Sequence, residues 1–143
     1  MKIYLAGKMG GLPFEEMYEW RAKLKNALNA HAKGSGVNIQ VINPVDFYNF
    51  ETKRHQNELE VEEFELAHVK SSDIVIVNLD GLKSSIGTII ELHDARYHHR
   101  IPVIAFGDKN LYDELHPWTK NDITRVEACI DDVVNYIRDF YFV

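Results

Sequence analysis

Short apolar runs alternate along the chain with longer amphipathic segments. Strand-like runs lie at 2–6, 73–79 and 101–106, and weaker ones lie at 37–42 and 124–130. The runs at 73–79 and 101–106 are continuously apolar, which is typical of strands covered on both faces of a parallel sheet. The apolar pattern therefore predicts five strands, most of them in a buried parallel sheet.

Amphipathic helices are predicted between these strands, over 13–32, 57–71, the segment after Gly87, and 131–142. The first begins at a proline and is expected to end before Gly34. This alternation predicts an α/β fold, a doubly wound five-stranded parallel sheet in a single domain spanning 1–143.

Ligands of doubly wound sheets bind beyond the carboxyl ends of the strands. Four loops are expected there, at 7–12, 43–56, 80–87 and 107–118. These loops carry most of the unusual residues of the chain, so the functional site is expected among them.

Charge and composition narrow the classes of partner. The net charge of −6 argues against binding a nucleic acid polymer, although backbone amides and one or two cations can still hold a small anion. No stretch of about 18 apolar residues predicts a membrane-spanning helix, so no membrane partner is expected. The run at 2–6 is too short for a signal peptide, and the single cysteine excludes an intramolecular disulfide. A cytoplasmic protein is expected.

The first loop, "AGKMGG", is rich in glycine. Gly7 and Gly10 let backbone amides approach a ligand closely, and Lys8 adds a cation. The loop matches neither the Walker pattern nor G-x-G-x-x-G. It is interpreted either as a tight turn into a helix or as a contact loop for phosphate or sugar.

The stretch "SSIGTIIEL" places a carboxylate, Glu91, among apolar residues of a predicted helix. Ser84 or Ser85 can cap that helix, whose free amides favour an anion. Gly87 lies four residues before Glu91 and therefore on the same face, where it leaves space for a substrate. The alternative is that Glu91 is a solvated helix residue.

Four segments follow one another along the chain: "KIYLAGKM", "SSDIVIVNLDG", "GTIIELHDA" and "RIPVIAF". In order and spacing they resemble the nucleoside 2-deoxyribosyltransferase superfamily, which includes the 2'-deoxynucleoside 5'-monophosphate N-hydrolases. The resemblance implies a flavodoxin-like fold and no metal or organic cofactor. It also implies a homodimer or higher homo-oligomer with shared active sites.

The resemblance assigns the catalytic roles. Glu91 matches the nucleophile that attacks the anomeric carbon and forms a covalent deoxyribosyl intermediate. Tyr4 matches the residue that orients this carboxylate, although it is also explained as an ordinary buried aromatic. Glu65 stands where the family has an aspartate that protonates the base, and it is equally explained as a solvated residue of an acidic helix.

The resemblance also suggests substrate contacts. Asp80 and Gly81 match the family's D-G loop. Transferases that act on free nucleosides have an aspartate at the position of Ser85, whereas the N-hydrolases have a serine that contacts phosphate, and Lys8 can add a cation there. His116 matches a residue that a neighbouring subunit donates to the 5' end of the sugar, or it is a surface residue.

The aromatic loop after the second strand offers contacts for a nucleobase. Asp46, Phe47 and Tyr48 are the candidates, with core packing an equal explanation for Phe47.

Transfer of the sugar to another base is the first expectation for function. Release of the base from a 5'-monophosphate to water, favoured by Ser85, is the alternative, and a nucleotide-binding module without turnover is a second alternative. All three expectations share a small-molecule nucleoside or nucleotide as the ligand.

Overall fold

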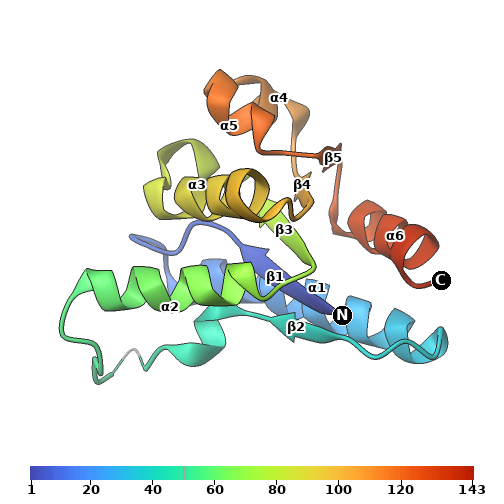
Figure 1. Cartoon of the computed structure of the whole chain (residues 1–143), viewed down its shortest axis with the longest axis horizontal. Helices are drawn as coiled ribbons and strands as arrows, with labels where there is room; N and C mark the ends of the chain where they lie inside the picture. Colours follow the sequence, from blue (N-terminus) through green and yellow to red (C-terminus); the bar gives the residue numbers. More distant parts are fainter. Residues whose placement is uncertain (50) are drawn as a thin grey trace.

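Parallel strands form one sheet through the centre of the molecule, which a computed structural model describes for residues 1–49 and 51–143. Phe50, in the predicted loop 43–56, lies outside the described residues. The strands are β1 (Lys2–Ala6), β2 (Gln40–Ile42), β3 (Ile74–Asn78), β4 (Val103–Phe106) and β5 (Arg125–Glu127). Their spatial order is β2-β1-β3-β4-β5 (Figure 1). This order confirms the predicted doubly wound, flavodoxin-like fold.

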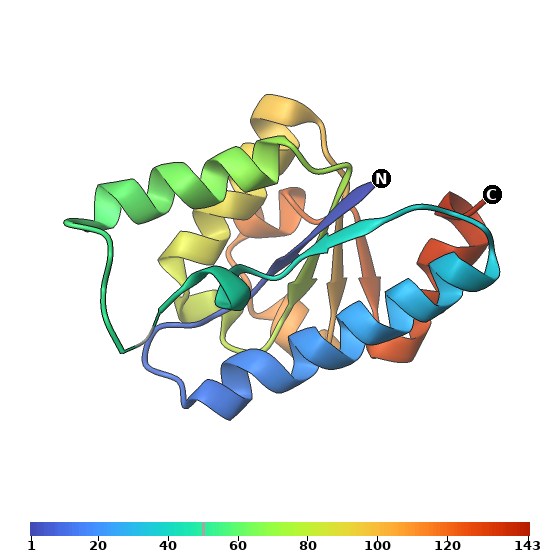
Figure 2. The same cartoon turned by 90° about the horizontal axis from the view of Figure 1, so that it is seen from below.

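Helices cover both faces of the sheet. They are α1 (Phe14–Gly34), α2 (Glu58–Lys70), α3 (Ile86–His93), α4 (Lys109–Asp113), α5 (Pro117–Asn121) and α6 (Ile130–Tyr141). Short 3-10 turns at Pro44–Phe47 and Leu82–Ser84 lead toward α2 and α3, and a π-helical turn at Asp94–His98 extends α3. In Figure 2, α1 and α6 lie on one face of the sheet and α2 and α3 lie on the other.

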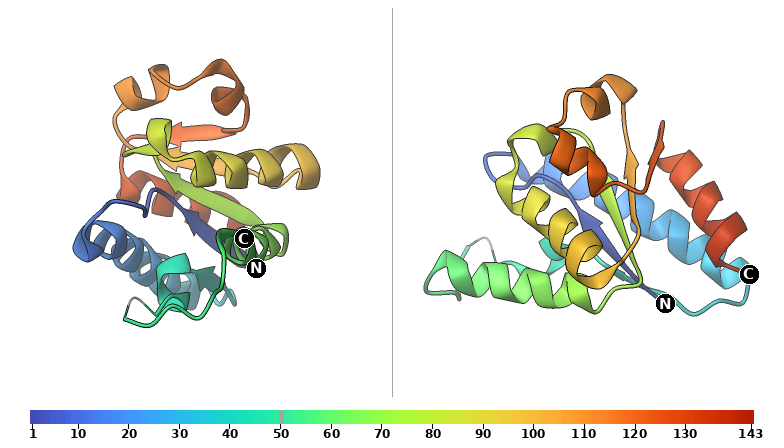
Figure 3. Two further views of the ribbon diagram at one scale, coloured as in Figure 1. Left: turned by 90° about the vertical axis from the view of Figure 1, so that its left-hand side faces the viewer. Right: turned by 45° about the horizontal axis from the view of Figure 1, so that its top comes forward.

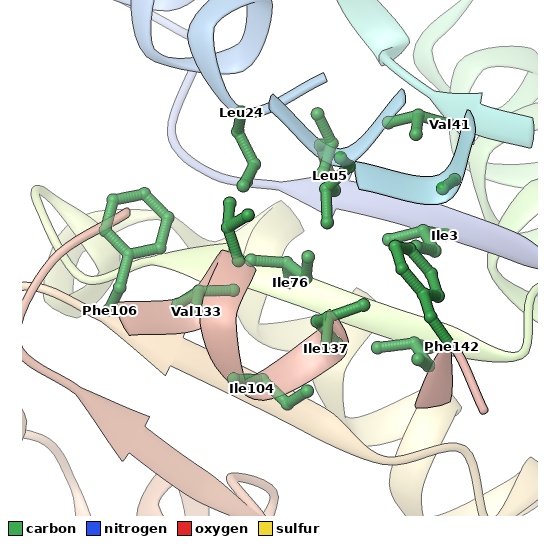
Figure 4. Packing of buried hydrophobic residues seen from close by; sticks show 14 residues of the cluster. Ile3, Leu5, Leu24, Val41, Ile76, Ile104, Phe106, Val133, Ile137 and Phe142 are labelled. Atoms are coloured by element: carbon green, nitrogen blue, oxygen red, sulfur yellow. The ribbon is translucent and has the colours of Figure 1, made fainter. Parts of the chain in front are cut away.

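The alternation of side chains along β1 divides the core into two layers. Ile3 and Leu5 pack with Leu24 of α1 and Ile137 of α6 (Figure 4). Tyr4 and its neighbour Ala6 face the opposite way, into the layer under α2 and α3. Every residue of β3 and β4 is buried, which confirms that these continuously apolar runs are covered on both faces.

The end of α1 corrects one predicted boundary. The helix continues through Gly34, and Gly36 is the residue that adopts a left-handed conformation, with φ +69°. The amide of Val37 then donates to the carbonyl of Ala32 at 2.9 Å. The helix therefore ends at Gly34, and the chain turns away from it at Gly36, because that position requires positive φ.

Two other predictions differ from the structure at the sheet edges. The run at 37–42 forms a strand only from Gln40 onward, because its partner β1 begins at Lys2 and gives the earlier residues no ladder to join. The predicted loop 107–118 contains α4 and the start of α5. Asp108 and His116 cap these two short helices with their side chains, which explains helical turns in a segment without a long apolar period.

Three segments far apart in the sequence meet at the carboxyl end of β1. The loop after β1, the segment leading into α2 and the start of α3 lie at one side of the molecule (Figure 3, right). None of the helices within 1–49 and 51–143 is long and apolar enough to cross a membrane.

Candidate active site

A cavity of about 770 Å³ opens where these three segments meet. Its walls come from the end of β1, the loop after it, the 3-10 turn Pro44–Phe47, α2 and the first turn of α3. A volume of this size lies in the range of ligand pockets, about 300–1,000 Å³. The cavity also lies at the end of the sheet where doubly wound folds bind ligands.

Glu91 lines the cavity and is only 7% exposed. The hydroxyl of Tyr4, buried at the centre of β1, donates to Oε1 of Glu91 at 3.1 Å. Burial, and then the neighbouring Glu65 carboxyl, raise the pKa of Glu91 well above its usual value. The Tyr4 hydrogen bond and the charge of Arg21 act in the opposite direction. Glu91 is therefore a buried carboxyl held by few donors, not a solvated helix residue.

Glu65 approaches the same place from α2 and is half-buried at the cavity wall. The hydroxyl of Tyr48 donates a hydrogen bond to its Oε1. Burial, and then the bond to Glu65, raise the pKa of Tyr48. Two carboxyls side by side hold one proton more readily than two negative charges, because like charges repel. The arrangement thus brings two carboxyl groups together in a single cavity, and Glu65 raises the pKa of Glu91.

Arg21 is a buried cation that the sequence analysis missed. Its Nη1 donates to the carbonyl of Met17 at 2.6 Å and its Nη2 to the carbonyl of Gly7 at 2.9 Å. Burial lowers the pKa of Arg21 to about 10, so it remains charged at neutral pH. Its guanidinium lies 4.4 Å from the ring centre of Trp20. One signal in the sequence could have revealed it. Arg21 lies on the apolar face of α1 together with Leu24 and Leu28, where a charged residue is unusual.

Gly7 makes the closeness of this cation possible. A Cβ at this position would lie 2.7 Å from Cζ2 of Trp20 and 3.2 Å from Nη2 of Arg21. Gly7, which was predicted as a ligand contact, therefore also has a structural role. The backbone at this position passes directly over the side chains of Trp20 and Arg21 in α1.

Lys8 and the serines before α3 form a polar side of the cavity. Nζ of Lys8 donates to Oγ of Ser84 at 3.3 Å, and Oγ of Ser85 lies 2.8 Å from Oγ1 of Thr88. Ser85 is the N-cap residue of α3 by position, but its side chain makes no capping hydrogen bond, so the expected side-chain cap is not present. This side of the cavity thus brings two serines and Lys8 to the N-terminal end of α3, and the cavity lining also includes Lys53, Arg54 and His55.

The predicted site residues divide into two groups. Those that line the cavity are Tyr4, Gly7, Lys8, Gly10, Phe47, Tyr48, Glu65, Ser85, Gly87 and Glu91. Those that lie outside its lining in the same chain are Asp46, Asp80, Gly81 and His116.

The four residues outside the lining have other contacts. Asp46 accepts from Nζ of Lys25 at 2.9 Å, and His116 accepts from the amide of Trp118 at 3.2 Å. Asp80 and Gly81 lie at a smaller neighbouring pocket, where the left-handed Gly81 (φ +72°) packs against Lys8. In residues 1–49 and 51–143, no group of three or more His, Cys, Asp or Glu is placed to hold a metal ion.

Burial of Glu91 predicts a pH-dependent cost in stability. Because its pKa is raised in the folded protein, Glu91 favours folding below its unfolded pKa of about 4.3 and loses that contribution as pH rises through its folded pKa. Glu91→Gln stays neutral, so its free energy of unfolding should exceed that of the wild type at pH 8, and this difference should shrink toward pH 4. Urea unfolding at both pH values measures it. The exposed Glu62→Gln serves as the control and should show no such trend; an equal difference for Glu91→Gln at both pH values would contradict the prediction.

Several solved structures resemble this fold. Similar solved structures include a conserved protein from Enterococcus faecalis V583, with a TM-score of 0.74 and 20% identity over 96% of this chain and 97% of that one. A 2-deoxyribosyltransferase from Bacillus psychrosaccharolyticus has a TM-score of 0.51 and 22% identity over 95% and 92%. A CMP N-glycosidase from Clostridium botulinum has a TM-score of 0.51 and 13% identity over 99% and 100%. These likenesses support the fold.

Sequence comparison identifies the family. No curated protein matches the chain. The family described as "Nucleoside 2-deoxyribosyltransferase like" matches residues 1–107, which span β1 through β4 and include both Tyr4 and Glu91. The chain therefore belongs to the nucleoside 2-deoxyribosyltransferase-like family.

Proposed function

We propose that this protein cleaves the N-glycosidic bond of 2'-deoxynucleosides through a covalent glutamyl-deoxyribosyl intermediate and transfers the sugar to another base. The observation that carries the proposal is the buried Glu91 carboxyl, which is hydrogen-bonded by Tyr4 and lies beside Glu65 in the same cavity. Family membership gives the class of bond, since the family is described by nucleoside deoxyribosyl transfer.

In the first step, an oxygen of Glu91 attacks C1' of the sugar. Before the attack the proton passes from Glu91 to the neighbouring Glu65, which leaves Glu91 as the carboxylate. The C1'–N bond then breaks, its electron pair stays on the base nitrogen, and Glu65 gives the proton to the base. Protonation is required because an anionic nucleobase leaves poorly. Tyr4 keeps Glu91 in one orientation during this attack, with one oxygen bound and the other directed at the sugar.

In the second step, a different base attacks C1' and displaces Glu91. Glu65, now a carboxylate, takes the proton from the incoming nitrogen, so the first step runs in reverse with a new base. Tyr4, Glu65 and Glu91 perform both steps without a metal or organic cofactor. The small-molecule substrate fits the sequence expectation of a cytoplasmic enzyme that binds neither nucleic acid polymers nor membranes.

Transfer is tested by incubating the protein with a 2'-deoxynucleoside and a different free base. Chromatography should detect a new nucleoside and no free deoxyribose. Free deoxyribose without any new nucleoside would count against transfer. Release of no base from any nucleoside or monophosphate would leave only the binding module without turnover.

Glu91→Ala should lower base release by a factor of roughly 10³ or more, because the nucleophile is lost. Mass spectrometry of the quenched wild type should find a deoxyribosyl adduct on the peptide that contains Glu91. Glu62→Ala, an exposed glutamate of α2, is the matched control and should keep full activity. An adduct on another residue, or an active Glu91→Ala, would exclude this mechanism.

A second candidate is hydrolysis of 2'-deoxynucleoside 5'-monophosphates, with water in place of the acceptor base. The supporting observation is the polar side of the cavity, where Lys8, Ser84 and the N-cap Ser85 meet the start of α3. A hydroxyl, an ammonium group and free helix amides suit a phosphate dianion. An aspartate at position 85 would repel it.

The second candidate is tested by comparing two variants, Ser85→Asp and Ser85→Asn, whose new side chains have the same size but differ in charge. If the phosphate binds here, Ser85→Asp should reduce kcat/KM for a 5'-monophosphate at least about tenfold more than Ser85→Asn does, owing to charge repulsion. The unphosphorylated nucleoside should show no such difference. If the two variants respond alike to both substrates, a phosphate at Ser85 is excluded.

We also propose that the protein works as a homodimer or larger homo-oligomer with shared active sites. Ile86, Ile90 and Tyr97 are exposed along α3 and its π-helical turn, and Trp118 of the adjoining α5 is 78% exposed. Such an apolar surface is typical of an interface. Ile86 also lines the cavity, so a second copy on this surface would complete the cavity wall. His116 is the residue that such a copy would donate.

Sedimentation velocity tests the oligomer. The wild type should sediment as a dimer or larger species, and the double variant Ile90→Glu/Tyr97→Glu should shift toward the monomer and lose base release, because two charges cannot be buried unpaired. Phe140→Glu is the control, since Phe140 is an exposed aromatic on α6. A monomeric wild type at every concentration would disprove the proposal.

A further inference from the structure

Tyr48 has no role in the reaction described so far, yet its hydroxyl is the hydrogen-bond donor to Oε1 of Glu65. It is half-buried and lines the cavity beside the two carboxyls. The bond joins residues 17 positions apart, on different elements. The contact therefore comes from the tertiary structure and brings a phenol to the carboxyl proposed to protonate the base.

The segment before Tyr48 is held to α1. Oδ1 of Asn43 accepts from the amide of Val45 at 3.1 Å and closes the 3-10 turn. Asp46 accepts from Nζ of Lys25 at 2.9 Å, and this contact ties the turn to α1. Asp46, predicted as a substrate contact, thus has a contact that helps to fix the start of this loop.

The ring of Phe47 joins the same segment to α2. It stacks on His68 with 5.0 Å between ring centres and 9° between planes, and it meets the edge of Phe64 at 5.6 Å. Tyr48 therefore follows a residue held on α2, the helix that carries Glu65. This restricts where its hydroxyl can lie.

We propose that Tyr48 is the positioning residue for the general acid, which it holds so that the second oxygen of Glu65 delivers its proton to the departing base. This inference rests on the proposed N-glycosidic cleavage. When the C1'–N bond breaks, its electron pair goes to the base and the proton leaves Glu65, which becomes a carboxylate. The Tyr48 bond then becomes charge-assisted and strengthens, so it stabilises that product of proton transfer.

The two tyrosines divide the work between the two carboxyls. Tyr4 binds Oε1 of Glu91 and Tyr48 binds Oε1 of Glu65. Each carboxyl is thus bound by a different tyrosine through one of its two oxygens. Tyr4 serves bond formation at the sugar, whereas Tyr48 serves departure of the base.

A substrate whose leaving group needs no proton can distinguish two roles of Tyr48: positioning of the general acid Glu65, or mere attachment of the loop to α2. 4-Nitrophenyl 2-deoxyriboside releases 4-nitrophenolate, which is a stable anion and leaves without a proton. It is compared with the nucleoside that the wild type cleaves fastest, both as 5'-phosphates if the monophosphate is preferred.

Tyr48→Phe should lower kcat for the natural substrate by roughly ten- to a hundredfold, the effect of losing a hydrogen bond to a charged group, with KM little changed. Its kcat for the nitrophenyl substrate should stay within about threefold of wild type, since no acid is used.

Two further variants make the result decisive. Glu65→Gln should show the same selectivity, with a loss of roughly 10²–10⁴ on the natural substrate alone. Phe64→Leu weakens the aromatic contact between loop and α2 but keeps the Tyr48 hydroxyl, so it should affect both substrates equally. If Tyr48→Phe also affects both substrates equally, or neither, Tyr48 only attaches the loop and the inference is wrong. If the wild type cleaves neither substrate, the proposed function itself is wrong. If the wild type cleaves both and only Glu91→Ala loses both activities, the proposed function is supported whatever the result for Tyr48→Phe.

Discussion

The burial of Glu91 beside a second carboxyl is the constraint on which the site depends. A carboxylate in a nearly dry environment is unfavourable unless donors or a proton compensate for the lost hydration. Here one tyrosine hydroxyl and one buried guanidinium favour the charged form of Glu91, whereas burial and a neighbouring carboxyl favour its neutral form. Each of these partners comes from a different element, β1, α1 and α2, so the arrangement exists only when the sheet and both helical layers are assembled.

The fold supplies rigid positions for these groups. Tyr4 lies in the middle of a buried strand, paired with β2 and β3 on either side, and cannot move without disturbing the sheet. Glu91 lies in the short helix that follows β3, whose first turn forms the polar wall of the cavity. Arg21 is fixed by two backbone carbonyls, one of them in the loop after β1. Loops thus contribute contacts such as that of Lys8, while Glu91 and Arg21 stand on helices, as precise chemistry requires.

The buried cation and the carboxyl pair also explain why such a site lowers stability. Arg21 is fully buried, and among the described residues its Nε has no hydrogen-bond partner. A buried group without a partner costs on the order of 1–3 kcal/mol, and more when it is charged. The two apolar layers of the sheet offset this cost, since their cores are continuous and well buried. Stability is concentrated in the sheet, and the functional groups are placed where they reduce it.

The sequence by itself determined the order of strands and helices, because burial on both faces leaves continuous apolar runs and amphipathic helices leave a periodic stripe. It also identified Glu91, Tyr4 and Glu65 as candidate catalytic residues. The motifs around Glu91 and Tyr4 match a family that includes this chain, and Glu65 was found from its spacing to those motifs. The Tyr48–Glu65 bond and the placement of Arg21 could not be predicted, since both depend on how α1, α2 and the loop before α2 pack. The same holds for Asp46, which lies outside the cavity lining and forms an ion pair with Lys25 of α1. Periodicity reports which face of an element is buried, whereas only the packed structure decides which polar groups then meet.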